Sequence, residues 1–111
     1  MNHRSQILHL ERIGQLLLDT RLAALRSAAA AREESEGRLA GLVAADCNCD
    51  DMSEISAQLA MLGYQRWADA RRSEINLTLA RQMAAWMEAK DAARDAFNKN
   101  EALRALGAKR L

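Results

Sequence analysis

Proline is absent from all 111 residues of the sequence, and no other feature constrains the fold as strongly. Proline interrupts a helix because it lacks a backbone N–H group and its ring clashes with the preceding turn. The sequence is also rich in alanine, glutamate, arginine and leucine, which all favour helical backbone. We therefore expect an all-α protein with long, unbroken helices, and the length suits a single domain.

A short polar segment interrupts this helical sequence near its middle. The segment is "DCNCDD", residues 46–51, whose asparagine and aspartates favour turns. It separates a predicted helix at about residues 5–46 from a second at about 51–106, with the turn at 47–50. Two long helices joined by a tight turn form an antiparallel hairpin. We predict that residues 1–111 form one antiparallel coiled-coil hairpin domain.

Residues with known capping preferences mark the two ends of the second helix. The stretch "DMSE" has the pattern of a capping box, in which Asp51 accepts from a first-turn amide and Glu54 reaches back. Gly107 is suited to end the helix, because glycine readily adopts the left-handed conformation of many C-caps.

Large side chains recur every eleven residues in the second helix, at Tyr64, Ile75, Trp86 and Phe97. Eleven residues complete about three turns and a further 20°, so these side chains lie on one nearly straight line. Such a period predicts almost no supercoil, or a weak right-handed one. We expect the line to form the core against leucines of the first helix. The predicted core residues are Leu18, Leu22, Leu25, Ile75, Leu79, Trp86 and Phe97.

The predicted turn also determines which residues of the two helices face each other. Because both helices rise equally per residue, position i of the first helix faces roughly position 99 minus i of the second. Gly14 then lies near Trp86 and Ser35 near Tyr64, so that small residues oppose large rings. The second helix extends past the first by about ten residues, which leaves residues 100–111 as a basic overhang.

Trp67 stands outside the eleven-residue series, about 60° from the line through Tyr64. Two interpretations of Trp67 are open. An exposed tryptophan on a thin hairpin is a good anchor for a protein partner. Alternatively, its ring folds back across the groove between the helices.

The two cysteines, Cys47 and Cys49, lie in the polar turn and resemble half of a metal site. A closed zinc site takes four ligands, and the two histidines, His3 and His9, lie at the far end of the first helix. We therefore interpret the segment as a polar turn with incidental cysteines, and we expect no metal and no cofactor.

Catalytic motifs are absent from the sequence, which has no glycine-rich phosphate loop and no Ser/His/Asp grouping. Arg71, Arg72 and Glu74 could line an anion pocket in a small all-helical enzyme, but such a pocket needs three or more helices. In a two-helix hairpin they form exposed ion pairs instead. We expect a non-enzymatic protein, with a small helical enzyme as the less favoured alternative.

Charge and hydropathy limit the location and the partners. The net charge is +1, from 16 basic and 15 acidic residues, which argues against a general nucleic-acid binder. No segment has the pattern of a signal peptide or a membrane span, so a cytoplasmic protein is expected. Alanine dominates the apolar residues and buries little surface, so a lone hairpin is thin. We expect a protein partner or a homodimer to stabilise it.

The second helix, "GYQRWADARRSEINLTLARQMAAWMEAKDAARDAFNKNEALRAL", is similar to that of the FliJ/YscO family of flagellar and type III secretion export components. The likeness lies in an aromatic start, repeated Arg and Glu spacing and a basic end. The resemblance implies a coiled-coil stalk that enters the ring of the export ATPase and contacts the export gate and export chaperones, at the cytoplasmic face of the membrane through these partners.

Charge and shape suggest how the ends of such a stalk would be used. The open end, with Ile7, Leu10 and the basic overhang, would enter the ring, and the aromatic end would face the gate. The residues expected to bind partners are Tyr64, Trp67, Leu103, Leu106, Lys109 and Arg110. The alternative is a generic coiled-coil adaptor or scaffold that forms a helical-bundle homodimer.

Overall fold

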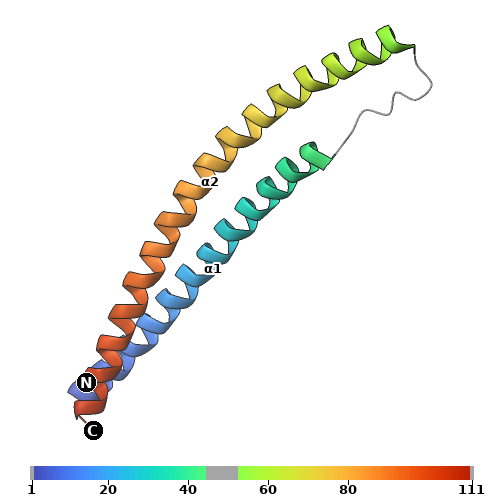
Figure 1. The fold of residues 1–111 in the computed structure, drawn as a ribbon. Coiled ribbons are helices and arrows are strands. Elements are labelled where there is room, and N and C mark those ends of the chain that lie inside the picture. Colours follow the sequence, from blue (N-terminus) through green and yellow to red (C-terminus); the bar gives the residue numbers. More distant parts are fainter. Residues whose placement is uncertain (1, 45–52, 111) are drawn as a thin grey trace. The chain divides into compact units, whose positions relative to one another are not determined.

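A computed structural model describes residues 2–44 and 53–110 of the chain (Figure 1). It contains α1, His3–Ala44, and α2, Glu54–Arg110, and the described residues form no strand. The predicted all-α fold with two long helices is confirmed, and each helix begins and ends within a few residues of its expected bounds. The predicted turn at 47–50, with both cysteines, lies outside the described residues.

Side-chain caps start both helices. The Asn2 Oδ1 atom accepts a hydrogen bond from the Ser5 amide at 2.8 Å, and the Ser53 Oγ atom accepts one from the Ser56 amide at 3.3 Å. Each bond satisfies one of the free amides of a first turn. Ser53 thus caps α2, whereas Asp51 of the predicted capping box lies outside the described residues.

Gly107 does not end α2, contrary to expectation. The helix continues to Arg110, and none of the described glycines has a positive φ. A Cβ atom at Gly107 would collide with the Glu11 carboxylate of α1 and would touch Ile7. The glycine therefore serves close packing between the helices rather than a C-cap.

The contacts of the chain divide it into two compact units. Unit 1 is Met1–Ala30 with Met83–Leu111, and unit 2 is Ala31–Gln82. In unit 1 the start of α1 (blue) and the end of α2 (red) run in opposite directions beside each other, as the contact between Ile7 and Gly107 requires (Figure 1). That all 111 residues form one domain stays a prediction.

The buried face of each helix repeats every seven residues. From Ala68 to Gly107, the buried and half-buried positions of α2, apart from the half-buried Ala92, alternate in steps of four and three residues. These positions are 68, 72, 75, 79, 82, 86, 89, 93, 96, 100, 103 and 107. The positions of α1 that follow the same spacing are 7, 11, 14, 18, 25, 28, 32, 35, 39 and 42. We call this face of each helix its seam; its period is that of coiled-coil packing.

The predicted eleven-residue line does not coincide with the seam. Relative to a seven-residue repeat, each step of eleven residues turns the side chain about 50° away. Ile75 is buried and Tyr64 and Trp86 are half-buried, but Phe97 is 51% exposed. Phe97 and the exposed Leu22 are therefore wrongly predicted as core. Leu18 and Ile75 are buried, and Leu25, Leu79 and Trp86 are half-buried.

Small side chains dominate the seam. Half of the buried apolar residues are alanines, namely Ala68, Ala93 and Ala96; the others are Ile7, Leu18 and Ile75. Burying a leucine or isoleucine stabilises a fold by about 1.5–3 kcal/mol, whereas a single methyl group contributes about 0.8 kcal/mol. The seam thus lets the helices approach closely but supplies little hydrophobic stabilisation.

The predicted register is wrong by about 17 residues, or about 25 Å along the helix. Gln15 of α1 bonds to Asn100 in unit 1, and Ser35 bonds to Gln82 in unit 2, where the prediction had Ser35 near Tyr64. Gly14 lies against Asn100 and Leu103, not against Trp86. The prediction assumed that a tight turn sets the register, whereas polar and small residues of the seam set it.

This shift exposes the opposite end of α2 from the one expected. The predicted overhang at residues 100–111 is wrong, because Leu103 and Gly107 pack on the start of α1. By the register of Ser35 and Gln82, Ala44 lies opposite about residue 73, and Tyr64 reaches back to bond to Leu42. Residues 54–63 of α2 instead lie beyond the part of α1 that the structure describes. Ile55, Leu59 and Leu62 are exposed in this segment.

Candidate protein-interaction surfaces

Tyr64 and Trp67 form an aromatic pair at one groove of unit 2. Their ring centroids lie 5.9 Å apart with a tilt of 39°, which is a favourable aromatic geometry. The Tyr64 hydroxyl donates a hydrogen bond to the Leu42 carbonyl oxygen at 3.3 Å. That bond ties α2 to α1 and holds the Tyr64 ring, while Trp67 remains 56% exposed. Trp67 therefore both borders the groove and presents much of its ring to solvent.

The groove beside this pair has a volume of about 440 Å³, and we call it the Tyr64–Trp67 groove. Its lining residues are Arg38, Gly41, Leu42, Tyr64, Trp67, Arg71 and Ile75. Gly41 matters to its shape, because a Cβ atom there would meet no atom within 4 Å. A side chain added at this position would begin in open space at the lining of the groove.

Two arginines border the groove from opposite helices. Arg38 of α1 pairs with Glu34 at 2.7 Å, and Arg71 of α2 pairs with Glu74 at 3.0 Å. The pairing of Glu74 with a nearby arginine was expected from the sequence. All four side chains are at least 45% exposed, so each pair stabilises its helix by only a few tenths of a kcal/mol.

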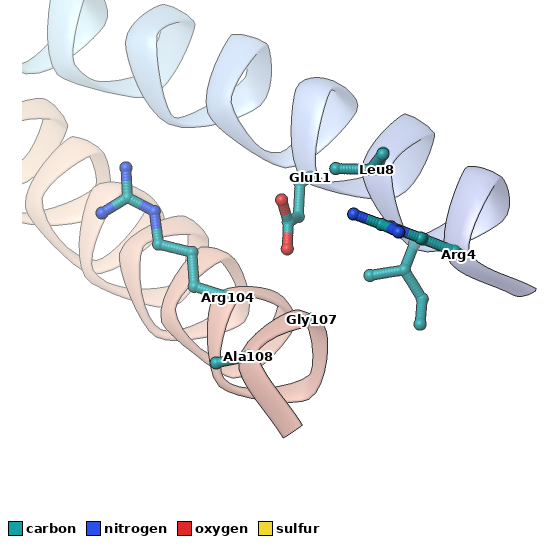
Figure 2. Close-up of a pocket in the computed structure, with 7 residues that line it drawn as sticks. Arg4, Leu8, Glu11, Arg104, Gly107 and Ala108 are labelled. Atoms are coloured by element: carbon teal, nitrogen blue, oxygen red, sulfur yellow. The ribbon is translucent and has the colours of Figure 1, made fainter. Parts of the chain in front are cut away.

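A second pocket lies at the open end of unit 1, with a volume of about 340 Å³ (Figure 2). It is lined by Arg4, Ile7, Leu8, Glu11, Arg104, Gly107 and Ala108. In Figure 2, Glu11 directs its carboxylate across the pocket toward the turn of α2 that carries Gly107. The pocket carries charges of both signs, so its lining does not select one charge in a ligand.

A buried polar layer adjoins this end pocket. Asn100 is only 2% exposed, and its Nδ2 atom donates to the Gln15 Oε1 atom at 3.2 Å. Arg104 donates to the same oxygen at 3.4 Å. A single buried asparagine in a coiled-coil seam specifies register at some cost in stability. Sequence reasoning missed this layer, because an asparagine between Lys99 and Glu101 resembles a solvent-exposed residue.

Large apolar side chains flank the seam of α1 on both sides. Helical geometry places Leu10, Ile13 and Leu17 on one side and Leu8 and Leu22 on the other. All five are exposed. One partner helix covers only the seam, so unit 1 has more apolar surface along α1 than α2 can cover.

The remaining predicted partner-binding residues lie near the end of α2. Leu106 and Lys109 are exposed, as expected for surface residues. Leu103 is half-buried and packs on Gly14, so it is a seam residue rather than part of a free surface. Arg110 ends α2.

Metal-binding groups do not gather among the described residues, where no three His, Cys, Asp or Glu side chains lie close enough to hold an ion. His3 and His9 are exposed, and Cys47 and Cys49 lie outside the described residues. Neither described helix is long and apolar enough to cross a membrane.

Comparison of the chain with protein families, with curated proteins and with solved structures finds no match.

Proposed function

We propose that the chain is a non-catalytic helical hairpin that binds protein partners through its exposed apolar side chains. One observation carries this proposal: sixteen large hydrophobic residues of the described helices are exposed. They occur in both units, on the flanks of the seam and at the start of α2. Extended apolar surface on a thin helical protein is typical of a binding surface.

The finer proposal is a stalk of a flagellar or type III export apparatus that binds the export ATPase ring and the export gate in the cytoplasm, with export chaperones as further partners. It derives from the resemblance of residues 63–106 to the FliJ/YscO family. The hairpin fold is compatible with such a stalk. Since Ile7 and Leu103 pack in the seam, the residues proposed to contact the ring are Leu10, Leu106, Lys109 and Arg110.

Co-purification with the export ATPase of the same organism tests the finer proposal. Leu10→Glu combined with Leu106→Glu places two charges on the exposed surface of the open end and should abolish binding. Ala23→Glu is the control, because Ala23 is exposed on the same helix and is not one of the sixteen large hydrophobic residues. If the unmodified chain does not bind the ATPase, or both variants bind equally, the export stalk is rejected.

A second candidate function is a scaffold that forms a helical-bundle homodimer. The observation that favours it is the apolar flank on each side of the α1 seam, which a second hairpin could cover. Light scattering across micromolar concentrations tests it. A dimer that Ile13→Glu converts to a monomer supports the scaffold, and a monomer at all concentrations contradicts it.

A further inference from the structure

We propose that the Tyr64–Trp67 groove binds a peptide segment of a protein partner in which acidic side chains neighbour large apolar ones. This inference rests on the proposed protein-binding function and names the chemistry of the partner at one surface. It is carried by the shape of the groove, by its apolar lining and by the sign of its charges.

The apolar part of the groove provides an anchor site. Its lining includes Ile75, 6% exposed, the half-buried Leu42 and the Tyr64–Trp67 pair. Trp67 is fixed against Tyr64 while more than half of its surface is open. A preorganised, partly exposed tryptophan contributes strongly to binding, because little side-chain entropy is lost when a partner covers it. An apolar side chain of the partner would insert here, over Gly41.

The charged part of the groove selects the sign of the partner. Arg38 and Arg71 line the groove, and no acidic residue is among its lining residues. A smaller cleft of about 120 Å³ shares Arg38, Arg71 and Ile75 with it, and Glu74, the ion-pair partner of Arg71, also lines this cleft. Two guanidinium groups from opposite helices thus flank one apolar recess, which is complementary to carboxylates on either side of an apolar side chain.

The present partners of these arginines do not block such binding. Glu34 and Glu74 lie on the same helices as the arginines that they contact, and both carboxylates are more than half exposed. Exposed pairs of this kind contribute little free energy, so a guanidinium can turn to a partner's carboxylate at small cost. The two nearby carboxylates and the net charge of +1 favour a peptide over a nucleic acid.

Fluorescence anisotropy with two labelled synthetic peptides tests the proposal on the full chain. One peptide consists of leucine and glutamate, and the other of leucine and lysine at matched length. The leucine–glutamate peptide should bind at least about tenfold more tightly, with an affinity that weakens as salt is added. Equal binding of the two peptides, or tighter binding of a labelled single-stranded oligonucleotide, overturns the proposal.

Substitutions then locate the site. Arg38→Gln with Arg71→Gln should weaken binding of the leucine–glutamate peptide about five- to tenfold. Arg81→Gln, also on α2 but outside the lining of the groove, should leave it unchanged. An equal loss of peptide affinity in both variants would show a general charge effect and contradict the assigned site.

Gly41 offers a variant in which stability and binding can be measured separately. Gly41→Leu adds an apolar side chain at the lining of the groove, and it should raise the melting temperature, because leucine favours helix and its Cβ atom meets no described atom within 4 Å. Gly37→Leu is the matched control, because its Cβ also meets no atom within 4 Å and Gly37 does not line the groove. Peptide binding should fall at least tenfold for Gly41→Leu only; retained binding rejects the groove.

The peptide assay and the partner assay separate the two levels of inference. If the chain binds its protein partner but does not distinguish the two peptides, only the groove assignment is wrong. If the peptides behave as expected and no protein partner is bound, the proposed function is wrong and the groove stays an isolated peptide site.

Discussion

Two kinds of small residue in α1 differ in what surrounds them. Gly14 lies where an added Cβ atom would come within 3.0 Å of the Asn100 Oδ1 atom and 3.2 Å of the Leu103 Cδ1 atom. Gly37 and Gly41 have open space at the same position. Gly14 is therefore needed for packing against the buried polar layer, whereas the other two cost the helix stability without a packing reason.

Alanine substitutions should separate these two roles by the sign of their effect. Gly14→Ala should lower the free energy of unfolding by about 1 kcal/mol, because crowding of Asn100 exceeds the gain in helix propensity. Gly37→Ala should raise it by up to about 1 kcal/mol. Urea denaturation followed by circular dichroism measures both. A stabilising Gly14→Ala would mean that the Gly14–Asn100 contact does not exist in solution.

At the scale of the helices, sequence reasoning identified the two elements and most of their extent. The absence of proline and the polar middle segment were sufficient, since both act locally. The seam was hard to recognise because more than a third of its positions carry polar residues or glycine, such as Arg72, Gln82 and Asn100. The core was instead predicted from the aromatic residues, whose eleven-residue spacing follows a different face of α2 from the seam.

The register and the candidate groove were less accessible from sequence. Register depends on which polar groups pair between helices, as Ser35 does with Gln82, and no local pattern encodes that choice. Tyr64 and Trp67 were recognised as candidate binding residues, but the contributions of Arg38 and Gly41 depend on the register and could not be predicted.

Truncations on α2 should distinguish the seam from the eleven-residue line. Ile75→Ala removes a residue buried in the seam and should destabilise the chain by about 2–4 kcal/mol. Phe97→Ala removes a larger side chain that is mostly exposed, and it should cost less than about 1 kcal/mol. Thermal or urea unfolding measures both changes in stability. A larger loss of stability for Phe97→Ala than for Ile75→Ala would support the core predicted from the eleven-residue spacing.

For the whole molecule, the two units present different surfaces to partners. Unit 1 combines the buried polar layer with apolar flanks along α1, and unit 2 carries the Tyr64–Trp67 groove and the uncovered start of α2. Because hydrophobic burial in the alanine-rich seam is weak, the proposed binding of a protein partner to the folded chain would add to its stability.

Hydrogen exchange should report this division along α2. Amides of residues 54–63 should exchange at least about tenfold faster than those of residues 72–100, because the described part of α1 does not cover them. Mass spectrometry of peptic fragments measures the difference in exchange rate. A partner that binds residues 54–63 should slow their exchange and reduce this difference. Uniform protection along α2 would contradict the uncovered start of the helix.

Every surface assigned to the chain depends on the register of α1 and α2, which a pair of electron–electron distances tests most directly. With Cys47 and Cys49 replaced by serine, spin labels on exposed Arg12 and Glu101 are compared with labels on Arg12 and Glu88. The structure predicts that the Arg12–Glu101 distance is shorter, by about 10 Å, because Glu88 lies about 20 Å further along α2. If the Arg12–Glu88 distance is instead the shorter of the two, the register predicted from a tight turn is right and the register described here is wrong.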